Sequence, residues 1–246
     1  MSATTYLRQA RETIFPPASN PHGPLPVLLL GWTVVTGLVD AYSYLELHHV
    51  FVANMTGNVV FLGFSLAGAP GFLWWASLLA IAAFMVGANI GGRFLASNTG
   101  QHRSRLLYYA GTTQLALFIA SALLALALPP ADATLSLAAL VILLSVAMGL
   151  QNSIARGLSV PDLTTTVLTL TITGLAGDGS GAGKKNNVGR RVLAIVSMAL
   201  GALIGGLMVQ AEAPALALIA SAALTAAITW RAFAHRNDDA AWVKRK

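Results

Sequence analysis

Long apolar runs separated by short polar segments dominate this chain. Six of these runs are about 20 residues long, the length that an α-helix needs to cross the hydrocarbon core of a bilayer. We therefore predict an all-α polytopic membrane protein with six transmembrane helices. The predicted spans cover residues 26–46, 72–95, 106–128, 133–157, 191–210 and 215–233.

Two further apolar segments are too short to cross a membrane comfortably. The first runs from His48 to Gly63 and the second from Ser159 to Leu170. The first begins with β-branched and aromatic residues typical of extended chain, and from Asn54 it becomes helical, with Asn54 or Thr56 as the N-cap. An extended piece followed by a half-helix, present twice, is how many transporters build a binding site in the middle of the membrane.

Basic residues decide how the two short segments lie. If both crossed the membrane, the loop with Arg93, Arg103 and Arg105 would face outside, against the positive-inside rule. If both are re-entrant, all basic segments face the cytoplasm: this loop, residues 1–25, the loop around Lys184 and residues 235–246. We therefore predict two short re-entrant half-helices, and cytoplasmic N- and C-termini in the cell inner membrane.

The two halves of the chain also align with each other. Three pairs of segments match in the same order: 37–41 with 149–153, 55–68 with 164–177, and 87–92 with 201–206. Each half holds three full spans, an odd number, so the halves insert in opposite directions and form an inverted 3+3 repeat. The predicted parts are a polar cytoplasmic leader (1–25), a first membrane repeat (26–128), a second, inverted membrane repeat (133–234) and a basic cytoplasmic tail (235–246).

The composition agrees with a membrane protein. Of the 246 residues, 56% are hydrophobic and 10% charged, whereas a soluble domain is about a quarter charged. The net charge of +6 comes from short basic runs between the spans, which suits contact with anionic lipid better than binding to nucleic acid. We expect the lipid bilayer and a small-molecule solute as partners, no nucleic acid, and leave a homo-oligomer open.

The starts of the two half-helices carry short polar side chains. A helix N-terminus offers unpaired N–H groups and about half a positive charge, which favours an anion or a polar neutral molecule. The same side chains could instead only cap the half-helices and bond to neighbouring spans. The predicted substrate-binding residues are Asp40, Asn54, Thr56, Gly57, Asn58, Gln151, Asn152, Thr164, Thr165 and Thr166.

Two charged side chains each allow two interpretations. Asp40 is an acid inside a span, so it is either a proton-coupling group facing a cavity or a group that pairs with Arg156 or caps nearby backbone. Asn152 is its mate in the repeat. Arg156 could neutralise an anionic solute, or anchor the cytoplasmic end of its helix and pair with Asp162.

The sequence offers little support for catalysis or for a bound metal. Glu46, His48 and His49 lie close together, but a metal site needs three or four convergent ligands and no others can be named. The absence of cysteine excludes disulfides and thiolate ligands. No catalytic ordering such as Ser-His-Asp or H-E-x-x-H is present. We therefore predict a protein that is not an enzyme and has no cofactor and no metal.

Three motifs make the chain recognisable: Phe-Val-Ala-Asn-Met-Thr-Gly-Asn at 51–58, Gly-Leu-Gln-Asn at 149–152 and Val-Pro-Asp-Leu-Thr-Thr-Thr at 160–166. With them the chain resembles the YoaK-like family of bacterial inner-membrane proteins, over roughly residues 28–233. The resemblance implies a multipass membrane protein and supplies no activity, because the family is of unknown function. At the level of fold alone, the broken-helix plan is also similar to formate/nitrite channels and uracil/sulfate-type permeases.

These features lead to one main hypothesis and two alternatives. The main hypothesis is a small-solute transporter or channel whose site lies between the two half-helix N-termini. The first alternative is a non-transporting membrane scaffold or sensor. The second is a metal-ion transporter that uses Asp40, Glu46, His48 and His49.

Overall fold

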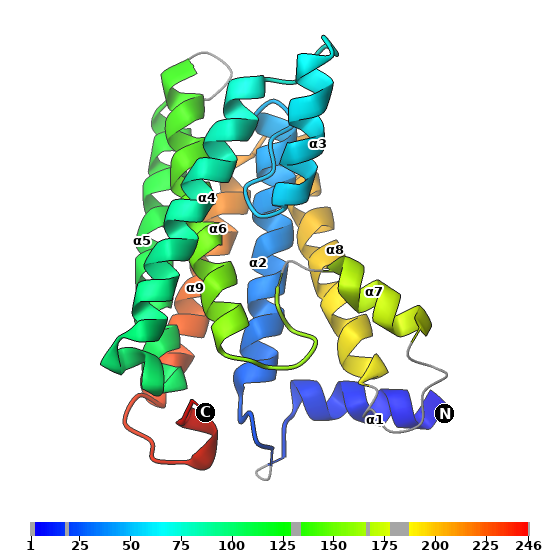
Figure 1. Ribbon diagram of the computed structural model, residues 1–246, viewed down its shortest axis with the longest axis vertical. Coiled ribbons are helices and arrows are strands. Elements are labelled where there is room, and N and C mark those ends of the chain that lie inside the picture. Colours follow the sequence, from blue (N-terminus) through cyan, green and yellow to red (C-terminus); the bar gives the residue numbers. More distant parts are fainter. Residues whose placement is uncertain (1–2, 18–19, 129–133, 166–167, 178–186, 246) are drawn as a thin grey trace.

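The computed structural model describes residues 3–17, 20–128, 134–165, 168–177 and 187–245, which form an elongated bundle of helices (Figure 1). Six helices are long and apolar enough to cross a membrane, and this confirms the predicted number of spans. The described residues contain no β-strand. The six spans are α2 (Leu25–Glu46), α4 (Trp74–Ala96), α5 (Arg103–Ala127), α6 (Thr134–Gly157), α8 (Val188–Gln210) and α9 (Ala215–Ala234).

Two short helices, α3 (Met55–Leu66) and α7 (Leu168–Gly177), interrupt the series of spans. Helix α2 ends and α4 begins at the same end of the bundle, so the segment that holds α3 returns to the side it came from (Figure 1). Helix α6 ends and α8 begins at the opposite end, so the segment that holds α7 does the same from that side. Both segments are re-entrant, as the charge distribution predicted.

The spans pack in pairs that join the two halves of the chain. The most extensive contacts are between α2 and α8, between α4 and α6, and between α5 and α9. In the two halves, α2 is equivalent to α6, α4 to α8 and α5 to α9. Replacing each helix by its equivalent turns the α2–α8 pair into the α6–α4 pair, and the α5–α9 pair into itself. This is the contact pattern of an inverted repeat.

Glycine contacts show the repeat residue by residue. A Cβ added at Gly201 would lie 2.1 Å from the carbonyl oxygen of Val34, and one at Gly87 would lie 2.1 Å from that of Val146. Val34 and Val146 occupy equivalent positions in the two halves of the alignment. At both places only a glycine lets the backbones of two spans approach so closely.

The chain termini lie at one end of the bundle, and we call this the terminal end (Figure 1). Helix α1 (Ala3–Ile14) lies across this end. It is fixed to the first turn of α8, where Gly189 N–H donates to Gln9 Oε1 at 3.1 Å. The 3-10 helices η1 (Asn98–Gln101) and η4 (Ala241–Val243) lie at the terminal end too. The leader therefore contains a helix that the sequence analysis did not predict.

A buried amide network joins three spans at the centre of the bundle. Gln114 Nε2 donates to Gln151 Oε1 at 2.6 Å. Gln151 Nε2 donates to Thr36 Oγ1 at 2.9 Å and to the carbonyl oxygen of Trp32 at 3.2 Å. These bonds connect α5, α6 and α2 in surroundings from which water is excluded.

We expect Gln114→Leu to lower the free energy of unfolding by about 1–3 kcal/mol, because Gln151 Oε1 would lose its donor while staying buried. Adding Gln151→Leu should cost less than the sum of the two single changes, since the orphaned amide is then removed. Thermal unfolding of the purified protein in detergent measures both effects. Gln101→Leu, at an exposed glutamine, is the control, and strictly additive losses would contradict the network.

Candidate functional site

The first re-entrant segment is folded tightly onto itself. Asn58 is completely buried, and its side chain bonds to both backbone groups of Phe51: Oδ1 accepts from N–H at 2.9 Å and Nδ2 donates to the carbonyl oxygen at 2.6 Å. A side chain at Gly57 would collide with the Phe51 ring, at 2.6 Å from its Cδ2 atom. Asn58 and Gly57 therefore give the segment its shape.

Asp40 holds this segment against α2. Its carboxylate is 4% exposed and accepts two hydrogen bonds, from Ala53 N–H at 3.0 Å and from Asn54 Nδ2. Of the alternatives considered for Asp40, pairing with Arg156 is wrong, and the structure shows the bond to nearby backbone. Asn54 precedes α3 at its N-cap position, but its side chain bonds to Asp40 and makes no cap bond.

Aromatic side chains cover the same segment. Tyr44 stacks on Phe51 at a centroid distance of 5.0 Å and meets the His49 ring edge-on at 5.0 Å. Phe61 continues the cluster, at 5.5 Å from Phe51 and 5.3 Å from Phe72. We call Tyr44, His49, Phe51, Phe61 and Phe72 the aromatic cluster. It joins the last turns of α2 to α3 and to the chain that leads into α4.

The two histidines considered as metal ligands lie between α2 and α3. His49 Nδ1 is 3.1 Å from the carbonyl oxygen of Gly71, and His48 is exposed. Within the described ranges, no three His, Cys, Asp or Glu side chains lie together as a metal site requires. The arrangement of these residues therefore lends no support to metal transport.

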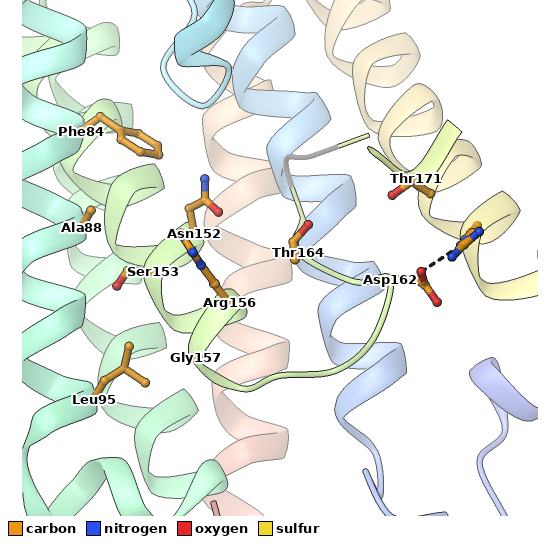
Figure 2. Close-up of a pocket in the computed structure, with 11 residues that line it drawn as sticks. Phe84, Ala88, Leu95, Asn152, Ser153, Arg156, Gly157, Asp162, Thr164 and Thr171 are labelled. Carbon is orange, nitrogen blue, oxygen red and sulfur yellow. Dashed lines mark hydrogen bonds and ion pairs between the residues drawn. The ribbon is translucent and has the colours of Figure 1, made fainter. Parts of the chain in front are cut away.

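The second re-entrant segment borders a cavity of about 1030 Å³. Figure 2 shows the cavity between α4 and α6 on one side and the segment leading to α7 on the other. No residue of the first re-entrant segment lines it, so it does not lie between the two half-helix N-termini as predicted. The lining residues are Phe84, Ala88 and Leu95 from α4, Asn152, Ser153, Arg156 and Gly157 from α6, and Asp162, Thr164, Thr171 and Arg191.

The two helices on this side of the cavity differ in chemistry. The α4 surface, with Phe84 and Ala88 one turn apart, is apolar, whereas Asn152 and Arg156 lie one turn apart on the polar α6 surface beside it (Figure 2). Arg191 at the start of α8 binds Asp162, with Nε 2.8 Å from Oδ1. The expected pairing of Asp162 with Arg156 is therefore wrong. No carboxylate of the described chain lies within ion-pair distance of Arg156, which stays exposed.

The threonines of the second segment have different surroundings. Thr164 lines the cavity, while Thr165 is 4% exposed and its Oγ1 has no hydrogen-bond partner in the described chain. Thr165 has a φ of +62°, a left-handed conformation that does not belong to an α-helix, so the predicted helix start at Thr165 is wrong. Thr166 lies outside the described residues.

The predicted binding residues thus fall into separate places. Asn152 and Thr164 line the cavity, and Gln151 belongs to the buried amide network, at 1% exposure. Thr56 is exposed on α3. Asp40, Asn54, Gly57 and Asn58 hold or shape the first segment. Phe84, Thr171 and Arg191 also line the cavity and were not predicted, because nothing in their local sequence distinguishes them from neighbouring residues.

The two halves therefore have different conformations around equivalent residues. Asn152 lines the cavity, whereas its mate Asp40 is buried and bonded to the first segment. Ser153 also lines the cavity, and its mate Ala41 is half-buried beside Gly205 of α8. A cavity therefore borders the second segment, while the first segment is bonded down on α2.

The family described as "Protein of unknown function (DUF1275)" matches residues 28–230. The UPF0700 transmembrane protein YoaK of Bacillus subtilis (strain 168) is 34% identical over 181 residues, which are 70% of this chain and 78% of the relative. No solved structure matches significantly. The chain therefore belongs to the DUF1275 family, the YoaK-like membrane proteins that its motifs resemble.

Proposed function

We propose that this protein is a small-solute transporter of the bacterial inner membrane that opens its two sides alternately. The observation that carries the proposal is the difference between the halves: Asp40 and the aromatic cluster hold one re-entrant segment against α2, whereas the other segment borders a cavity. In inverted-repeat transporters, the two halves exchange such conformations during transport.

The basic residues support an orientation for this state. Arg8 and Arg11 of α1, and the arginines around η1, lie at the terminal end. Under the positive-inside rule this end faces the cytoplasm, so the protein would be open inward, with cytoplasmic termini. A cavity that stops short of the first re-entrant segment favours a carrier over a channel, because a channel needs a continuous path.

The exchange of conformations can be tested with single cysteines, since the chain has none of its own. Ser153→Cys, in the cavity wall, should react rapidly with a membrane-impermeant thiol reagent added at the terminal end. Its mate, Ala41→Cys, should react slowly, and only with reagent added at the opposite end, because it becomes accessible when the first segment opens. Labelling of right-side-out and inverted vesicles measures both rates.

Flux of small solutes into liposomes completes the test. A transported solute should change the two labelling rates in opposite directions, because it changes the populations of the two states. If Ala41→Cys never reacts from the end away from the termini, and no solute of a broad panel crosses, the protein is a membrane scaffold or sensor instead.

A further inference from the structure

We propose that the cavity binds an organic anion of single negative charge with an apolar body, and that Arg156 is its main ionic partner. The inference rests on the proposed function, because it names the class of solute, but binding can be measured without transport. It depends on three observations: the charges in the cavity, its apolar wall and its size.

Among the described residues that line the cavity, one positive charge is unbalanced. Arg191 and Asp162 neutralise each other through their 2.8 Å ion pair. Arg156 has no acidic partner in the described chain and is exposed in the cavity wall. Its guanidinium is a planar set of donors that matches a carboxylate. Asn152, one turn earlier on the same helix, adds an amide that can donate or accept (Figure 2).

The apolar residues and the volume of the cavity indicate the rest of the ligand. Phe84, Ala88 and Leu95 form an apolar surface on α4, beside the polar residues of α6 and on the same side of the cavity. A volume of about 1030 Å³ lies at the upper limit of small-molecule pockets, which span about 300–1,000 Å³. An inorganic anion would leave the apolar wall in contact with water, whereas a carboxylate with a hydrocarbon or aromatic body would cover it.

Arg93 provides a matched comparison within the chain. It lies in the last turn of α4, as Arg156 lies in the last turn of α6, at the same end of the bundle. Arg93 is absent from the lining of this cavity and borders a separate hollow of about 410 Å³, whose described lining residues, such as Met85 and Val86, all belong to α4. It has the position of an arginine that anchors a span at the membrane surface.

The test uses benzoate and its neutral analogue benzamide with the purified protein in detergent. We expect benzoate to slow alkylation of Ser153→Cys, and benzamide to do so at least tenfold less effectively, because it lacks the charge. Arg156→Gln should weaken protection by benzoate at least tenfold, and Arg156→Lys by less. Arg93→Gln should leave protection unchanged. Each variant carries Ser153→Cys, and its melting temperature is recorded as a check on folding.

Several results would overturn the inference. One is equal protection of Ser153→Cys by benzoate and benzamide. Another is no protection by either benzoate or the longer carboxylate hexanoate. A third is an equal loss of benzoate protection in Arg156→Gln and Arg93→Gln. Because no membrane gradient is involved, protection of the predicted pattern without solute flux would refute the transporter and leave the anion site in place. Solute flux without protection of Ser153→Cys would refute the anion site and support the transporter.

Discussion

Gly201→Ala should destabilise the bundle by about 1–3 kcal/mol or more. The new methyl group would lie 2.1 Å from the carbonyl oxygen of Val34. That atom belongs to the backbone of α2, so relief requires α2 and α8 to move apart and weakens their packing along its length. Gly87→Ala, which brings a methyl to 2.1 Å from the carbonyl oxygen of Val146, should cost a similar amount, since the contact between α4 and α6 is its repeat equivalent.

Helices α8 and α4, which hold Gly201 and Gly87, also supply matched controls. Nothing lies within 4 Å of a Cβ added at Gly206 or at Gly92. Alanine at these places should be neutral or stabilise by about 0.5–1 kcal/mol, because glycine is a poor helix former. Thermal unfolding in detergent measures all four variants. Equal melting temperatures of Gly201→Ala and Gly206→Ala would contradict the close approach of the α2 and α8 backbones at Gly201.

Asp40→Asn should open the first re-entrant segment. One carboxylate oxygen becomes an amide nitrogen, so the side chain can no longer accept from both Ala53 N–H and Asn54 Nδ2. Hydrogen bonds to charged groups contribute about 1.5–3 kcal/mol. Labelling of Ala41→Cys from the end away from the termini should therefore accelerate by about tenfold or more.

Glu46→Gln is the control for Asp40→Asn, because it removes the other carboxylate of α2 without touching the contact that holds the segment. The direction of the effect matters as much as its size. In Asp40→Asn both halves carry asparagine at the equivalent position, so labelling of Ser153→Cys from the terminal end should slow. Unchanged rates at both cysteines would mean that Asp40 does not set the state of the protein.

The features that could be predicted from the sequence are those set by the bilayer. Span lengths follow from its thickness, and the re-entrant path follows from the arginines at 93, 103 and 105, because only that path keeps the basic loops on one side. The contacts in the structure also agree with the alignment of 37–41 with 149–153 and of 87–92 with 201–206. Its glycines meet in mirrored contacts, since close helix packing requires small residues at fixed positions.

The features that could not be predicted depend on contacts between distant parts of the chain. Asp162 binds Arg191 and not Arg156, which is nearer in the sequence, because the re-entrant segment places Asp162 beside α8. The leader forms α1, which the start of α8 supports through Gly189. The alignment treats the halves as equivalent, so it could not show that Asn152 faces a cavity while Asp40 is covered.

The pairing of α2 with α8 also bears on how the chain is made. Helix α2 is synthesised before the other five spans, yet the spans that it contacts, α6, α8 and α9, all lie in the second half of the chain. During synthesis the surface of α2 around Gly37, which packs on Met198 and Gly201 of α8 in the finished bundle, must face lipid or an insertion chaperone. A ribosome stalled before α8 would thus leave an assembly intermediate exposed to quality-control proteases.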